Sequence, residues 1–139
     1  MLGVENMFKS YPKIPKLIEL GIGDETEDSL ILSKFDRALA TELGILDEKV
    51  EFTQEEKPYY DLYKELYFKG YIPRTTLYEG TIYFRVGTKG YLRKKKKTEY
   101  LVALGGDWEK ALNLAVKMKK KLVIKQGDRF IFLTYHKFP

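Results

Sequence analysis

Apolar positions first recur at the spacing of an α-helix directly after Ser33. The segment from Ser33 to Asp36 has the spacing of a capping box, with Asp in place of the usual Glu. Gly44 predicts the end of this helix, and residues 45–52 alternate enough to predict a short strand or hairpin arm. These elements, with the Pro- and Gly-punctuated sequence before them, predict a small amino-terminal α/β lobe over residues 1–56.

A second helix is predicted after the polar stretch that runs from Thr53 to Pro58, because proline suits the first helical turn. Its apolar positions fall on one face: Tyr59, Leu62, Tyr63 and Leu66. Gly70 is expected to follow the last helical residue. We therefore place the domain boundary before this helix, which begins a carboxy-terminal domain over residues 57–139.

Strand patterns dominate the sequence after Gly70. Five segments are rich in β-branched and aromatic residues: 71–76, 81–86, 100–104, 122–124 and 130–135. Glu79-Gly80 separates the first two segments, and Gln126-Gly127-Asp128 separates the last two. The run 100–104 is apolar throughout, which indicates a strand covered on both faces.

A third helix is predicted between the third and fourth strands, with Asp107 as its cap. Its expected inner face consists of Trp108, Ala111, Leu112, Ala115 and Val116, so we expect Trp108 to pack in the core rather than to stack on a base. The order from residue 57 is helix, three strands, helix, two strands. This order predicts an α/β (α+β) fold with a mixed sheet flanked by helices.

Composition limits the kinds of site and partner that the chain can have. It has no Cys and one His, so disulfides and thiolate zinc sites are excluded, and we expect no metal and no cofactor. No apolar run is long enough to span a membrane and the start lacks the apolar centre of a signal peptide, so we expect a cytoplasmic protein. The net charge of +5 favours a polyanionic partner, although abundant Lys, Glu, Tyr and Ile is also typical of heat-adapted proteins.

Basic residues concentrate in the run from Arg93 to Lys97, which is predicted to be a loop. Such a run either contacts phosphates or is simply solvated. The candidate RNA contacts are Lys94, Lys95, Lys96 and Lys97. His136, the single histidine, has no evident partner for catalysis.

Four blocks of the sequence, in order, resemble motifs of the tRNA-intron endonucleases. Lys69-Gly70-Tyr71 resembles "rGy", and the segment 78–86 resembles "kfGadFRVY". The segment 98–102 resembles part of "HSEYLV", and the segment 114–123 resembles "LAhsvrKkLv". The resemblance extends over residues 58–138, while the amino-terminal lobe matches weakly.

The resemblance implies a metal-independent ribonuclease that cuts precursor tRNA at bulge-helix-bulge junctions. In this chemistry a ribose 2′-hydroxyl attacks the adjacent phosphate, with a tyrosine as base, a histidine as acid and a lysine that stabilises the transition state. The tyrosine position falls at Gly87, the histidine position at Lys97, and the lysine position at Lys120 or the adjacent Lys121. An arginine that clamps a bulged base falls at Asn113.

These departures predict that the isolated chain is not an enzyme, because general acid and base groups each contribute roughly 10²- to 10⁴-fold. Lys120 remains as a candidate RNA contact. The pattern resembles the structural subunit of archaeal heterotetrameric members of the family, which assembles with a separate catalytic subunit on precursor tRNA. The alternative is a stand-alone basic domain that binds RNA or DNA without an enzyme partner.

The resemblance also implies where subunits meet. The carboxy-terminal strand would pair with that of the partner, and an acidic loop before this strand would insert into a basic cleft. Here the loop residue is Asp128. The strand residues expected at the interface are Phe130, Ile131, Phe132, Leu133 and Tyr135. Because large apolar residues occupy both faces of this strand, it also fits an interior position in a sheet.

Overall fold

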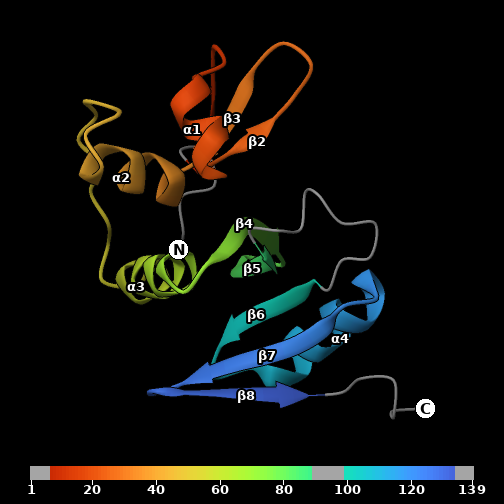
Figure 1. The fold of residues 1–139 in the computed structure, drawn as a ribbon. Helices are drawn as coiled ribbons and strands as arrows, with labels where there is room; N and C mark the ends of the chain where they lie inside the picture. The colour runs from red at the N-terminus through yellow and green to blue at the C-terminus, as the bar shows by residue number, and fades with distance from the viewer. Residues whose placement is uncertain (1–6, 89–98, 134–139) are drawn as a thin grey trace. The chain divides into compact units, whose positions relative to one another are not determined.

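The structure, a computed structural model, describes residues 7–88 and 99–133 (Figure 1). The chain divides into two compact units, residues 1–68 and residues 69–139. Helices and strands contribute to both, so the predicted α+β fold class is confirmed. The division falls one helix later than the boundary predicted at residue 57. None of the helices in the described ranges combines the length and the apolar character needed to cross a membrane.

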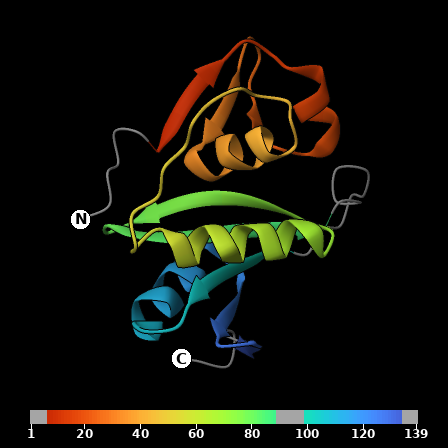
Figure 2. The same cartoon turned by 90° about the vertical axis from the view of Figure 1, so that its left-hand side faces the viewer.

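The first unit is built on a three-stranded antiparallel sheet in the order β1-β3-β2 (Figure 2). Its elements are β1 (Phe8–Tyr11), α1 (Pro15–Leu20), β2 (Asp24–Glu25), β3 (Leu30–Ser33), α2 (Lys34–Glu42) and α3 (Lys57–Phe68). Side chains from several elements form its core: Met7, Leu17, Ile22, Leu30, Leu32, Phe35 and Leu39. Gly23 lies beside this core at φ +90°, where an added Cβ would approach Leu32 Cδ2 to 2.5 Å.

The amino terminus of α2 has the predicted capping box. Asp36 N donates to Ser33 Oγ at 3.1 Å, and Ser33 N donates to Asp36 Oδ2 at 2.8 Å. The strand predicted over residues 45–52 is wrong, because this segment has no strand pairing. Its backbone is bonded instead to α2, where Thr41 Oγ1 donates to Glu48 O at 2.9 Å and Ile45 N donates to Ala40 O at 2.9 Å.

Aromatic packing explains why α3 belongs to the first unit. Phe52 stacks on Tyr60 with 4.6 Å between ring centroids and on Phe35 with 5.6 Å. The Tyr63 hydroxyl donates to the Asp36 carboxylate, so the residue that completes the capping box of α2 also binds α3. The predicted face of α3 is confirmed at Leu62, Tyr63 and Leu66, but Tyr60 and Tyr67 are buried in place of Tyr59.

The second unit is a five-stranded mixed sheet in the order β4-β5-β6-β7-β8. Its elements are β4 (Tyr71–Tyr78), β5 (Thr81–Thr88), β6 (Tyr100–Leu104), α4 (Trp108–Met118), β7 (Lys121–Gln126) and β8 (Arg129–Leu133). Neighbouring strands are antiparallel except β6 and β7, which α4 connects as a crossover. The β4–β5 turn places Glu79 at φ 49° and Gly80 at φ 77°, the positive values that a tight hairpin turn requires.

Helix α4 begins as predicted, with Asp107 Oδ1 accepting from Lys110 N at 3.2 Å. The helix packs on one face of the sheet through Ala111, Leu114 and Ala115, with Met118 partly buried. Trp108 is 51% exposed, so its expected core position is wrong, and Val116 is 47% exposed. The buried stripe begins one turn after Trp108 and is centred on Leu114 and Ala115, which leaves the first turn outside the packed region.

Candidate functional site

Two of the positions matched to the catalytic residues of the endonucleases, Gly87 and Lys120, fall at the same end of the five-stranded sheet. Gly87 follows Val86, which pairs with Tyr100 of β6, and Tyr100 in turn pairs with Lys121 of β7. This register brings Gly87 to the end of the sheet where Glu99 precedes β6. Glu99 in turn lies beside Lys120. The matched position Lys97 lies outside the described residues.

Gly87 is buried within β5 and pairs with Ile72 of β4. A glycine provides no side chain that can accept or return a proton, so this position cannot supply a general base. No group of three or more side chains suited to hold a metal ion lies together within residues 7–88 and 99–133.

Lys120 is held by a carboxylate of its own unit. Its Nζ lies 3.1 Å from Glu99 Oε1, and both side chains are largely buried. Lys119, at φ 57°, turns the chain from α4 into β7, and Lys120 N donates to Ala115 O at 2.9 Å. Glu99 therefore neutralises the cation that the sequence suggests as an RNA contact. No local sequence pattern singles out Glu99, because its pairing with Lys120 depends on the β6–β7 register.

The predicted interface strand, β8, lies at an edge of the sheet and pairs only with β7 among the described residues. The other edge strand, β4, contains Pro73, a residue that hinders pairing with another chain. The β8 strand has no proline and no lysine. Within residues 7–88 and 99–133, the outer edge of β8 therefore leaves backbone groups that can bind a further strand.

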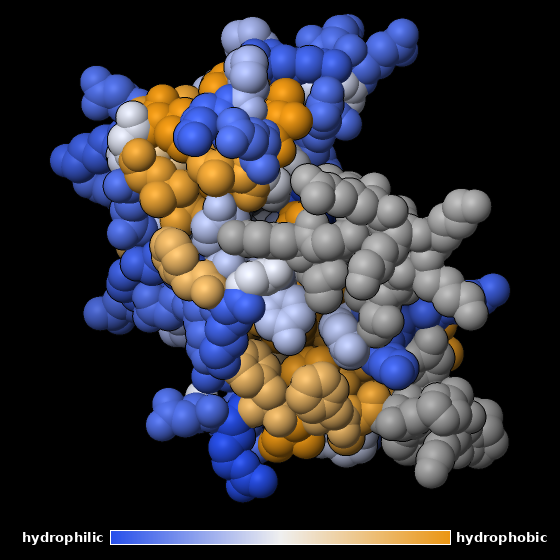
Figure 3. All heavy atoms as spheres, in the orientation of Figure 1, coloured by the Kyte–Doolittle hydropathy of each residue, from blue (hydrophilic) through white to orange (hydrophobic). Residues whose placement is uncertain are grey.

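An apolar surface accompanies this edge. Phe132 is 63% exposed and meets Tyr100 edge to face, with 5.9 Å between ring centroids. The ammonium groups of Lys69 and Lys125 lie over the Phe130 ring, 4.4 and 4.6 Å from its centroid. Figure 3 shows apolar side chains gathered in the lower part of the view, where Figure 1 places β6, β7 and β8.

The remaining predicted interface residues differ in their surroundings. Ile131 is partly buried, and Leu133 packs on the core beneath α4. Asp128 is exposed in the β7–β8 turn and makes no ion pair or hydrogen bond with the described part of the chain. Tyr135, the lysines 94–97 and His136 lie outside the described residues.

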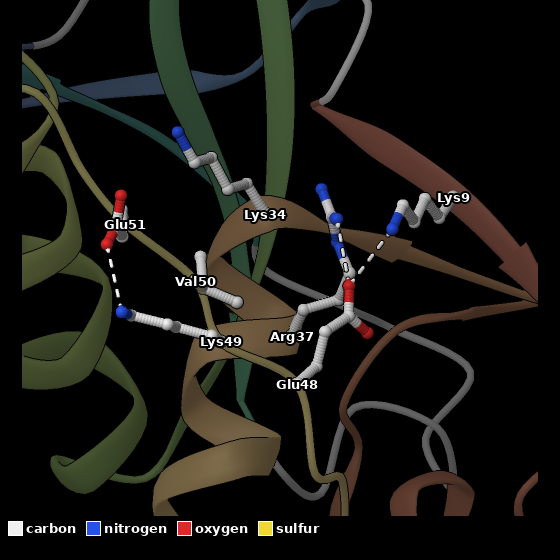
Figure 4. A pocket seen from close by; sticks show the side chains of 7 residues that line it. All are labelled: Lys9, Lys34, Arg37, Glu48, Lys49, Val50 and Glu51. Carbon is white, nitrogen blue, oxygen red and sulfur yellow. Dashed lines mark hydrogen bonds and ion pairs between the residues drawn. The ribbon is translucent and has the colours of Figure 1, made fainter.

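The first unit contains a charged cavity of about 230 Å³ (Figure 4). It is lined by Lys9, Lys34, Arg37, Glu48, Lys49, Val50 and Glu51. Arg37 Nη1 and Lys9 Nζ lie 3.3 and 3.1 Å from Glu48 Oε1, and the Tyr11 hydroxyl donates to Oε2 of the same carboxylate.

Ionisation in this cavity follows from these contacts. The hydrogen bond from Tyr11 lowers the pKa of Glu48, aided by Lys9 and Arg37 against the opposing effect of burial. Burial, with the adjacent Glu48 carboxylate, raises the pKa of Tyr11 to about 12. Burial alone would raise the pKa of Glu56, but hydrogen bonds from Lys34 and Thr53 outweigh it and the pKa is lowered.

Each cation of the cavity therefore has a carboxylate partner: Lys34 pairs with Glu56 at 2.8 Å, and Lys49 pairs with Glu51 at 3.4 Å. Figure 4 shows Lys9 and Arg37 directed toward Glu48, and Lys49 directed toward Glu51. The cavity thus has little excess charge with which to bind an anion. Its network instead fixes the irregular segment 45–56 to β1 and α2.

Comparisons with known proteins add no family to this geometry. No protein-family model matches the chain, and no curated protein sequence matches it. What the chain does is therefore inferred from the residues that its fold brings together.

Proposed function

We propose that this chain is the structural, non-catalytic subunit of a tRNA-splicing endonuclease that removes introns at bulge-helix-bulge junctions. The observation that carries the proposal is the convergence of positions 87 and 120 at one end of a single sheet. These positions are far apart in the sequence, and residues that act together on one phosphate must be neighbours in space. Their convergence supports the alignment from which the proposal starts.

The residues at these positions support a structural role. Cleavage by a ribose 2′-hydroxyl requires a base that takes the hydroxyl proton and an acid that protonates the leaving oxygen. Gly87 offers neither, and Glu99 holds Lys120 in an ion pair. The chain would therefore contribute assembly and RNA surface, while a partner with Tyr, His and Lys at the matching positions performs the reaction.

The edge strand β8 is the surface best suited to that assembly. A strand with a free backbone edge can bind an extended segment through main-chain hydrogen bonds, and exposed aromatic side chains add apolar contact area. Phe132 and the exposed Asp128 turn would lie at such an interface. The proposed complex is a heterotetramer of two structural and two catalytic subunits.

Reconstitution tests the proposal. A related chain with Tyr, His and Lys at the positions that match Gly87, Lys97 and Lys120 is sought in the source genome and mixed with this chain. The mixture should cut a bulge-helix-bulge RNA into products with a cyclic phosphate and a 5′-hydroxyl, whereas this chain alone should leave the RNA intact. Replacing the partner's histidine by Ala should abolish cleavage by the mixture.

Two outcomes would contradict the proposal. Cleavage by the purified chain alone would show that it carries its own catalytic groups. A genome without such a relative, together with RNA binding by this chain, would favour the stand-alone basic domain.

A further inference from the structure

Lysines gather at the turn that leads from α4 into β7. Four of the five residues in the range 117–121 are lysines, and the range contains no acidic residue. Backbone hydrogen bonds fix the turn, because Lys119 N donates to Val116 O at 3.1 Å and Lys120 N donates to Ala115 O at 2.9 Å. The lysines are therefore held close together on an ordered backbone.

Three consecutive lysines of this turn differ in their partners. The Lys120 side chain is 15% exposed, and its Nζ lies 3.1 Å from Glu99 Oε1. Lys119 and Lys121 are exposed, and neither forms an ion pair with another residue in the ranges 7–88 and 99–133. The two exposed lysines therefore keep their charge available to an anion in solution, whereas the charge of Lys120 is already neutralised.

The turn lies at the end of the sheet where Gly87 lies. Lys121 pairs with Tyr100, and Tyr100 pairs with Val86. Figure 1 shows the end of α4 on the same side of the second unit as the starts of β6 and β7. Because paired residues share a face of a sheet, Lys121 projects from the face of Tyr100 and Val86, and Gly87 belongs to the other face. Lys121 is therefore close to the matched catalytic positions without being one of the groups that face Gly87.

We propose that Lys119 and Lys121 bind backbone phosphates of RNA, and that Lys120 does not take part because Glu99 neutralises it. An exposed ammonium group can contact a phosphate without breaking an ion pair, and each contact releases counterions from the RNA. Contacts of this kind position the RNA without reading its sequence. The identification of the anion as RNA rests on the proposed function, whereas the availability of the two charges rests on the contacts of the turn.

A role in helix stability does not account for these two lysines. Cations in the last turn of a helix interact favourably with the helix dipole, and this effect falls off beyond that turn. Lys117 lies in the last turn of α4, whereas Lys119 and Lys121 follow Met118, the last helical residue. The dipole therefore explains Lys117, and the lysines after the helix are left for an external anion.

Binding of a fluorescein-labelled bulge-helix-bulge hairpin RNA, followed by anisotropy across a range of salt concentrations, tests the site. Lys119→Gln and Lys121→Gln should each reduce the slope of log K against log salt by about 1. The double variant should reduce it by about 2 and weaken binding at low salt by about tenfold. Replacing both lysines by Arg keeps the charges and should retain the slope of the wild type.

Two controls separate this site from a general effect of charge. Arg129→Gln removes one positive charge from the exposed start of β8, at the opposite end of the sheet, and should bind like the wild type. The variant that combines Lys120→Gln with Glu99→Gln removes the ion pair without changing the net charge. It should also keep the wild-type salt slope.

The proposal is overturned if the double Gln variant binds RNA with wild-type affinity and slope, or if Arg129→Gln lowers the slope as much as Lys121→Gln does. It is also overturned if the double Gln variant binds RNA normally but assembles poorly with the catalytic partner, because the lysines would then contact protein. The reconstituted cleavage assay is read separately. Loss of RNA binding in the lysine variants, without partner-dependent cleavage by the wild type, would retain this site and reject the subunit function.

Discussion

Replacing Glu48 by Gln removes the charge that three groups of the first unit share. Tyr11 and Lys9 of β1 and Arg37 of α2 all contact this carboxylate. The Arg37 side chain is only 5% exposed, and that of Glu48 is 25% exposed. The substitution therefore removes the Glu48 charge from beside a buried guanidinium, while the new amide keeps an oxygen that still accepts from Tyr11.

The expected cost follows from these exposures. The Lys9 pair is half exposed and contributes about 0.5 kcal/mol or less. Removing one partner of a fully buried ion pair costs about 3–5 kcal/mol, and partial exposure of Glu48 reduces this to about 1–2 kcal/mol. We therefore expect Glu48→Gln to lower the free energy of unfolding by about 2 kcal/mol.

Urea unfolding followed by circular dichroism measures this change. Glu51→Gln is the matched control, because its carboxylate lines the same cavity but is 79% exposed and pairs with an exposed lysine. It should change stability by less than about 0.5 kcal/mol. Equal effects of the two substitutions, or no effect of Glu48→Gln, would refute the assignment of Glu48 as the centre of the network.

The contacts of Glu48 also predict that the stability of the first unit depends on pH. The folded-state pKa of Glu48 lies below its ordinary value of 4.5, chiefly because of the Tyr11 hydrogen bond. At pH values between the folded-state pKa and 4.5, the unfolded chain binds more protons than the folded chain. The stabilisation that the Glu48 carboxylate provides is therefore present above about pH 4.5 and is lost as the pH falls through the folded-state pKa. The difference in the free energy of unfolding between wild type and Glu48→Gln should shrink over this acidic pH range. A difference that stays constant with pH would contradict this account.

Three further predictions concern packing and assembly. Gly23→Ala should destabilise the first unit by about 2 kcal/mol or more in urea unfolding, because φ is +90° and the new Cβ would meet Leu32 Cδ2 at 2.5 Å; wild-type stability would contradict the geometry. Trp108→Ala should cost less than about 1 kcal/mol, while Leu114→Ala, at a buried site, should cost about 3 kcal/mol; the reverse order would show that Trp108 packs. Asp128→Lys should leave the unfolding midpoint unchanged but reduce the mass of the complex with the catalytic partner in analytical ultracentrifugation, and an unchanged mass would remove this residue from the interface.

Long-range geometry explains which site residues the sequence missed. Gly87 and Lys120 could be named from sequence blocks, but their proximity depends on the register that pairs β5 with β6 and β6 with β7. The β6–β7 register also places Glu99 beside Lys120. None of these pairings follows from a local pattern, because residues far apart in the chain become neighbours only when the sheet forms.

Features whose causes lie within a few residues could be predicted before the fold was known. The Ser33–Asp36 capping box, the Asp107 cap and the Glu79-Gly80 turn were predictable, because caps and turns satisfy backbone groups locally. The tertiary structure alone decided that Trp108 is exposed, that residues 45–52 are held by α2 rather than by a strand, and that β8 lies at the sheet edge. Burial, pairing and edges depend on which distant segments meet, and strand register and core packing settle that only in the folded chain.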